Sequence, residues 1–94
     1  MQLAIQQLRD LGKLPRSSIA TSTELEKYES LIAKITLPLD NEDALVLIGL
    51  LGPDDCFGLA WTIIHLVETA PDWPIDQRFE GLDAYWVGVL KERI

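Results

Sequence analysis

Two strongly apolar segments in the middle of the chain constrain the fold more than any other feature. ALVLIGLL, residues 44–51, is apolar on every face of a helix, and CFGLAWTIIHLV, residues 56–67, contains no charged residue. A membrane span needs about 20 apolar residues, so both segments are too short to cross a bilayer and are expected inside the protein. Residues 40–43 have the composition of a helix N-terminus, and Gly52-Pro53 is a helix stop. These signals favour a helix for residues 44–51, with a buried strand as the alternative.

Helical spacing of apolar residues continues through the rest of the chain. An N-terminal stripe ends at Gly12 and Pro15, and an amphipathic helix over about residues 24–35 follows a cap at Thr21, Ser22 or Thr23. The sequence predicts a central helix over residues 54–70, between Pro53 and Pro71, and a last helix over residues 82–93. The side chains predicted to face the core are Leu3, Ala4, Leu8, Leu11, Leu25, Tyr28, Leu31, Ile32, Ile35, Phe57, Ala60, Trp61, Ile63, Ile64, Val67, Leu82, Tyr85, Trp86, Val89 and Leu90. We therefore expect residues 1–94 to form one all-α domain, a compact bundle of about five helices with an antiparallel central hairpin.

The formal charge of −7 is distributed unevenly along the chain. Residues 1–37 carry five basic and four acidic side chains, whereas residues 40–83 carry ten acidic side chains and a single basic one, Arg78. Repulsion from phosphates therefore argues against nucleic-acid binding by residues 40–83. A basic protein partner would instead be attracted to this region.

The residues that most often carry chemistry do not form a recognisable catalytic set. Cys56 and His65 are separated by nine positions on the expected central helix, which places them on opposite faces. Asp54 and Asp55 are expected to cap this helix, and Cys56 to be a small buried apolar side chain. One cysteine with one histidine is too small a ligand set for zinc, and residues 40–43 lack the glycine and spacing of a calcium loop. We expect no catalytic residues, no metal and no cofactor, and hence a protein that is not an enzyme.

A protein-binding site is the sharper hypothesis for the acidic region. Trp73 lies between Asp72 and Pro74, and an aromatic side chain ringed by carboxylates has the composition of an interaction hot spot for a basic partner. In an antiparallel hairpin, the loop after the second helix returns to the end at which the first helix begins. The predicted partner-binding residues are Trp73, Asp72, Asp76, Glu80, Asp40, Glu42 and Asp43. The alternative is that Trp73 folds over the end of the core and closes it.

Two resemblances add to this interpretation. Residues 41–70, two helices joined by the tight turn GPDD, resemble one helical hairpin of the HEAT-repeat kind. The small, acidic, helical profile is similar to that of bacterial immunity proteins that neutralise basic nuclease toxins, and it implies a protein-binding role without assigning any residue. The alternative is a structural role, as a homo-oligomer or a small subunit of a larger complex. The lone cysteine, and an N-terminus without the pattern of a signal peptide, favour a cytoplasmic location.

Overall fold

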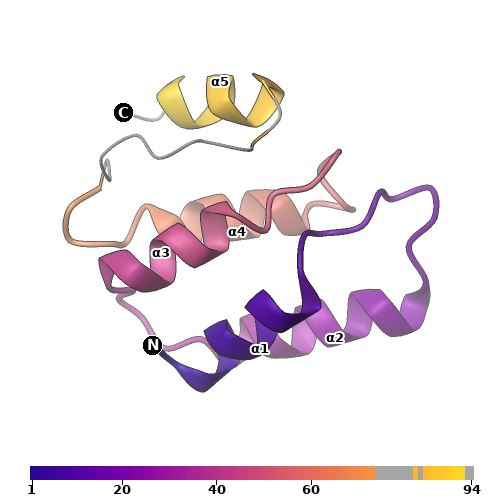
Figure 1. Cartoon of the computed structure of the whole chain (residues 1–94), viewed down its shortest axis with the longest axis horizontal. Helices are drawn as coiled ribbons and strands as arrows, with labels where there is room; N and C mark the ends of the chain where they lie inside the picture. Colours follow the sequence, from indigo (N-terminus) through magenta and orange to yellow (C-terminus); the bar gives the residue numbers. More distant parts are fainter. Residues whose placement is uncertain (74–81, 83, 93–94) are drawn as a thin grey trace.

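Helices account for most of the residues that the computed structural model describes, which are residues 1–73, 82 and 84–92. Within these ranges there is no strand, and the helices are α1 (Leu3–Leu11), α2 (Ser22–Ala33), α3 (Asn41–Ile48), α4 (Leu59–Val67) and α5 (Ala84–Glu92). α1 and α3 lie in front of α2 and α4, and α5 covers the side of α3 and α4 that faces away from α1 and α2 (Figure 1). α3 and α4 pack against each other and run in opposite directions. The predicted all-α bundle with five helices is confirmed for the described residues.

Local sequence signals set the facing ends of α1 and α2. α1 stops at Gly12, whose φ of 86° lies in the left-handed region that glycine adopts without strain. α2 begins with a capping box, in which the Thr21 and Glu24 side chains each accept the other residue's backbone N–H at 3.1 Å. The Tyr28 hydroxyl donates to the carbonyl oxygen of Gly12 at 2.9 Å. α2 therefore satisfies a carbonyl group at the end of the helix against which it packs.

α3 confirms the helix predicted for the first apolar segment. Asp40 is its N-cap, and Asp40 Oδ1 accepts the backbone N–H of Asp43 at 2.7 Å. Residues 49 and 50 form a turn, and Leu50 and Leu51 are buried like the helix before them. The segment therefore lies inside the protein as expected, although its last residues are not helical.

The central helix begins at Leu59, later than the sequence predicts, because residues 54–58 form a turn. Three consecutive residues of this turn have a positive φ: 47° at Cys56, 56° at Phe57 and 89° at Gly58. Asp54 caps the turn and not the helix, since its carboxylate accepts hydrogen bonds from the Ser17 hydroxyl at 2.7 Å and from the Cys56 N–H at 2.9 Å. The bond to Ser17 holds the turn against the segment after α1. The predicted capping of α4 by Asp54 or Asp55 is therefore wrong.

Four side chains predicted to face the core are exposed instead: Leu3, Leu11, Phe57 and Tyr85. In α1 the buried face is centred on Ala4, Ile5 and Leu8, which leaves Leu3 on the outside. Tyr85 precedes the buried Trp86, and adjacent helical residues point about 100° apart. Apolar spacing thus identified these helices but not the exact orientation of each one.

The core lies between the layer of α1 and α3 and the layer of α2 and α4, and it extends under α5. Its largest fully buried side chains are Trp86, Ile5, Leu8, Leu14, Leu39, Leu47, Leu51, Ile63, Ile64 and Leu90. Trp86 anchors α5, because its ring packs edge-on against Trp61 and its Nε1–H donates to the carbonyl oxygen of Gly52 at 2.7 Å. The prediction that Trp86 and Leu90 of the last helix face the core is confirmed. None of the helices in the described part of the chain is long and apolar enough to span a membrane.

Candidate protein-binding site

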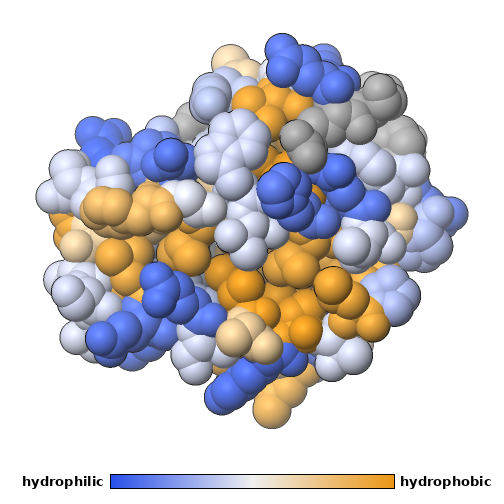
Figure 2. All heavy atoms as spheres, turned by 180° about the vertical axis from the view of Figure 1, so that it is seen from behind, coloured by the Kyte–Doolittle hydropathy of each residue, from blue (hydrophilic) through white to orange (hydrophobic). Residues whose placement is uncertain are grey.

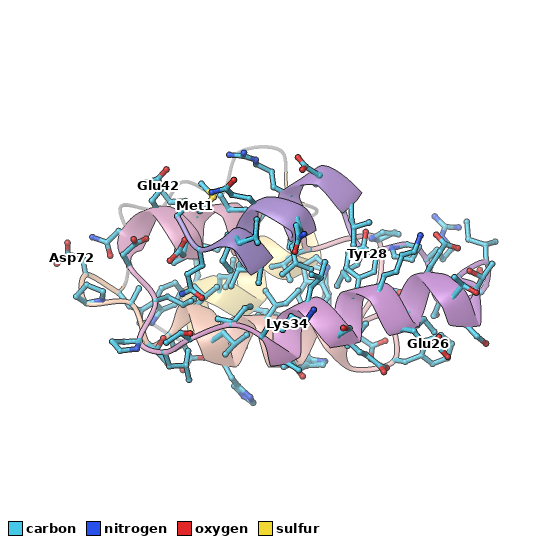
Figure 3. All side chains as sticks on the ribbon, turned by 90° about the horizontal axis from the view of Figure 1, so that it is seen from below. Met1, Glu26, Tyr28, Lys34, Glu42 and Asp72 are labelled. Atoms are coloured by element: carbon cyan, nitrogen blue, oxygen red, sulfur yellow. The ribbon has the colours of Figure 1, made fainter. Side chains whose placement is uncertain are left out.

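Hydrogen bonds join the start of α3 to the segment that follows α4. The Asn41 side-chain amide donates to Asp72 Oδ2, and the Asp72 backbone N–H donates to Asn41 Oδ1 at 3.3 Å. Beside this pair, the Leu39 N–H donates to Thr69 Oγ1 at 3.3 Å. The chain after α4 therefore returns to the beginning of α3, as the hairpin topology predicted. Glu42 and Asp72 both lie at this end of the molecule, whereas Glu26 lies at the opposite end (Figure 3).

Three of the predicted partner-binding carboxylates are exposed at this end, and we call Asp40, Glu42 and Asp72 together the acidic end. Asp72 is fixed by Asn41, and Asp40 is fixed by its capping bond to α3. Glu42 projects from the first turn of α3. The carboxylates thus stand on ordered backbone at the surface, where a cationic partner can reach them.

Asp43 does not belong to this surface, because its side chain is only 2% exposed. It lies one helical turn before the buried Leu47, so the helix repeat directs it towards the core. Its Oδ1 has no hydrogen-bond partner among the described residues, and its position in the first turn of α3 gives it the favourable field of the helix N-terminus. The prediction that Asp43 contacts a partner is therefore contradicted by its burial.

Trp73 is partly buried and packs against the edge of the core. Its backbone N–H donates to the carbonyl oxygen of Ala70 at 3.2 Å, which keeps it close to the end of α4. This position favours the interpretation in which Trp73 closes the core, while the residue remains partly exposed next to Asp72 in the sequence. Asp76 and Glu80, the other two predicted contact residues, lie outside the described residues.

The side chains considered for catalysis have identifiable structural surroundings. Cys56 is fully buried, and its burial, together with the charges of Asp54, Asp55 and Glu24, raises the pKa of the thiol. A raised pKa reduces the fraction of thiolate, which is the reactive form. His65 is exposed on α4. The hydrogen bond from the Ser17 hydroxyl, followed by the backbone bonds from Cys56 and Ser17, lowers the pKa of Asp54 and keeps it an ionised acceptor.

No group of three or more potential metal ligands occurs within the described ranges. A shallow groove of about 400 Å³ lies between α1 and α2, lined by Gln7, Leu11, Thr23, Glu26, Lys27, Ser30 and Leu31. Its walls mix apolar, polar and oppositely charged side chains, and it is wide open to solvent. Its openness distinguishes it from the enclosed cavity in which a protein usually holds a small molecule.

Phe57 is the surface feature that sequence reasoning missed. It was expected in the core, but it is 68% exposed at the tip of the turn before α4. The sequence did contain one local signal for a turn. An aspartate side chain such as that of Asp54 can accept the backbone N–H two residues later, here that of Cys56, and Gly58 permits a left-handed end to the turn. That signal competes with helical spacing that fits the same residues equally well.

Comparisons of the chain with protein-family models, with curated proteins and with solved structures find no match. The resemblances of residues 41–70 to a HEAT hairpin and of the whole chain to immunity proteins therefore stay predictions. The expectation that the chain is not an enzyme stays a prediction too. The acidic end, with Trp73 beside it, is the candidate site that the geometry supports best.

Proposed function

We propose that this protein is a non-catalytic binding module that recognises a basic protein partner through the acidic end. The observation that carries the proposal is the pair of hydrogen bonds between Asn41 and Asp72, which holds carboxylates from two distant segments on one surface. A partner with clustered lysine or arginine residues would meet several negative charges at once.

The charge distribution supports the same conclusion. The ten acidic and single basic side chains of residues 40–83 make this half of the chain strongly negative. Attraction between opposite charges accelerates the diffusional encounter of two proteins and suppresses partners of the same charge. The exposed part of Trp73 would add an aromatic contact that slows dissociation.

Neutralisation of a toxin is the most concrete version of this function. The resemblance to bacterial immunity proteins rests on small size, negative charge and helical structure, and those proteins bind basic nucleases. In this version the partner is a cationic nuclease, and binding blocks its approach to nucleic acid. A cytoplasmic location would place the protein where such a toxin acts.

The test is capture of partners by the tagged protein from native lysate, with elution by rising salt and identification by mass spectrometry. The purified partner is then titrated against a variant that combines Glu42→Lys with Asp72→Asn. Asp72→Asn keeps an oxygen that can accept from Asn41, and Glu42→Lys leaves the Asp40 cap intact, so the fold is retained. A matched control combines Glu29→Lys with Glu26→Gln, which changes the net charge equally on the exposed face of α2.

The proposal expects a basic partner that dissociates as salt increases, because surface attraction is screened over about 8 Å at physiological ionic strength. The variant at the acidic end should associate more slowly, and the α2 control should associate at the rate of the unmodified protein. Equal association rates for the two variants would contradict the placement of the site. Binding that does not respond to salt would contradict the electrostatic mechanism.

Self-association is the second candidate function, because apolar side chains gather on one face of the molecule. Hydrophobic side chains gather over the lower middle of the face opposite to the view of Figure 1, on the side where α2 and α4 lie (Figure 2). Ile32 of α2, Leu66 of α4 and Ile35, which follows α2, are only partly buried. A second copy or a larger complex could cover such a face. Sedimentation equilibrium at several protein concentrations distinguishes this function from a monomeric binding module, whose mass stays constant.

A further inference from the structure

A second exposed surface lies at the other end of the molecule, where two loops are joined. The Ser17 hydroxyl and backbone N–H both donate to Asp54 Oδ2, at 2.7 and 3.1 Å. These bonds hold the loop between α1 and α2 beside the turn before α4, away from the end of α4 at which Asp72 lies (Figure 1). Each loop also has its own internal bonds, from Ile19 N–H to the carbonyl oxygen of Arg16 and from Gly58 N–H to that of Asp55. Both loops are therefore ordered.

Each of these joined loops presents a large apolar side chain to water. Ile19 is 73% exposed and Phe57 is 68% exposed. They lie two positions beyond Ser17 and three positions beyond Asp54, the residues at which the loops meet. We call these two side chains, with the nearby carboxylates of Glu24, Asp54 and Asp55, the Ile19–Phe57 surface. An apolar pair rimmed by charged groups has the composition of an interaction site.

The backbone holds Phe57 outward against its local preference. Its φ of 56° lies in the left-handed region, which residues other than glycine rarely adopt and which is unfavourable for a bulky side chain. A helix extended backwards from Leu59 would have removed this conformation. Instead the turn buries Cys56 and exposes the much larger Phe57. The fold thus keeps an aromatic residue exposed on a hydrogen-bonded turn.

The charged groups near this turn are mainly negative. Asp54, Asp55 and Glu24 all lie close enough to act electrostatically on the buried Cys56, and Arg16 lies near Asp54. A symmetric contact between two copies of this surface would bring these carboxylates against each other. A partner with positive charges would pair with them, and a lysine or arginine could also lie over the Phe57 ring.

We propose that the Ile19–Phe57 surface is a second docking site, which binds a basic segment of a partner protein that carries an apolar side chain between its cations. The apolar side chain packs between Ile19 and Phe57, and the flanking cations pair with Asp55 and Glu24. This site is independent of the acidic end. A partner long enough to contact both ends would gain affinity from the second contact.

The test is an NMR titration of the ¹⁵N-labelled protein with the capped peptide GKFKGKFKG and its acidic counterpart GEFEGEFEG. The binding variant is Phe57→Asn, because asparagine tolerates a positive φ and so preserves the turn while the ring is lost. The matched control is Leu3→Asn, which removes an apolar side chain that is also 68% exposed, on α1. The charge variant is Asp55→Lys, and the double variant Glu42→Lys with Asp72→Asn serves as the control for the acidic end.

The proposal expects the basic peptide to shift the amide signals of residues 17–19 and 55–58. Phe57→Asn should weaken its binding by about tenfold or more, as for an aromatic hot spot, while Leu3→Asn changes it by less than about twofold. Asp55→Lys should weaken binding, and the double variant at the acidic end should bind normally. The proposal is overturned by equal binding of the acidic peptide, by shifts confined to other residues, by unchanged affinity in Phe57→Asn, or by no binding at about 1 mM peptide. Loss of binding only in the double variant would overturn it in favour of the acidic end.

Discussion

Trp86 donates its indole N–H to the carbonyl oxygen of Gly52 across 2.7 Å, and both groups are buried. This bond joins α5 to the turn that follows α3, across 34 residues of sequence. Gly52 also lies close to the Leu14 carbonyl group, and the Leu14 N–H donates to the carbonyl oxygen of Leu50, two residues before Gly52, at 2.8 Å. One short turn therefore connects α5, α3 and the segment after α1, and three segments depend on its geometry.

Replacement of Trp86 by phenylalanine should destabilise the protein by more than the lost ring volume alone. Trp86→Phe removes the donor and leaves the Gly52 carbonyl group buried without that partner, which costs about 1–3 kcal/mol. Urea unfolding measures the change in the free energy of unfolding. The control is Tyr85→Phe, which removes a hydroxyl from the exposed neighbour of Trp86. Equal losses in the two variants would mean that the buried hydrogen bond contributes nothing.

Alanine at Gly52 should destabilise the protein, whereas alanine at Gly88 should stabilise it. A Cβ added to Gly52 would lie 2.1 Å from the Leu14 carbonyl oxygen, so the backbone must shift, at a cost of about 1–3 kcal/mol. A Cβ at Gly88 meets nothing within 4 Å on α5, and glycine inside a helix is about 1 kcal/mol less favourable than alanine. Thermal unfolding of the two variants should therefore show shifts of opposite sign. If both variants shifted the unfolding temperature in the same direction, either the crowding at Gly52 or the free space at Gly88 would be wrong.

Much of the helical architecture could be predicted from the sequence because its signals are local. The cap at Asp40 lies within three residues of the N–H that it accepts, and the Thr21 capping box has the same short range. The return of Asp72 to the start of α3 followed from connectivity alone. Trp86 could be placed in the core because it lies on the apolar face of the last helix. Burial of a large apolar side chain stabilises a protein by roughly 1.5–3 kcal/mol.

The features that the sequence did not predict depend on contacts between distant residues. The turn before α4 is held by Ser17, which is 37 residues from Asp54, and the local signal at Asp54 and Gly58 does not by itself decide between this turn and a first turn of helix. The burial of Asp43 depends on the orientation of α3, which is set by packing against α1 and α4. For the candidate site, the sequence therefore identified the acidic character and the return of the segment after α4 to the start of α3. It did not identify which carboxylates are exposed, nor the exposed Phe57.

Alanine at Thr21 should weaken α2. Thr21→Ala removes the side-chain acceptor of the Glu24 N–H, and loss of an N-cap side chain costs about 1 kcal/mol. Thr23→Ala is the control, because Thr23 is exposed in the first turn and is not the cap. Urea unfolding compares the two, and hydrogen exchange of the Glu24 amide reports the local effect. A loss of stability in Thr23→Ala equal to that in Thr21→Ala would contradict the assignment of the cap.

The hydrogen bonds of Asp54 should make the stability of the protein depend on pH in the acidic range. The Ser17 hydroxyl, and then the N–H groups of Cys56 and Ser17, lower the pKa of Asp54 below its ordinary value of 3.8. A carboxyl group whose pKa is lower in the folded state stabilises that state above its unfolded pKa, and the contribution disappears as pH falls through the folded pKa. Asp54→Asn should therefore lower the urea midpoint most at neutral pH, and the difference should shrink as pH falls below about 4.

Ser17→Ala removes the first cause of the shift in the pKa of Asp54. Its effect on the urea midpoint should therefore shrink over the same pH range, and it should not add fully to the effect of Asp54→Asn. A difference that stays constant from neutral pH to below the ordinary pKa of Asp54 would show that the ionised carboxylate is not what holds the turn.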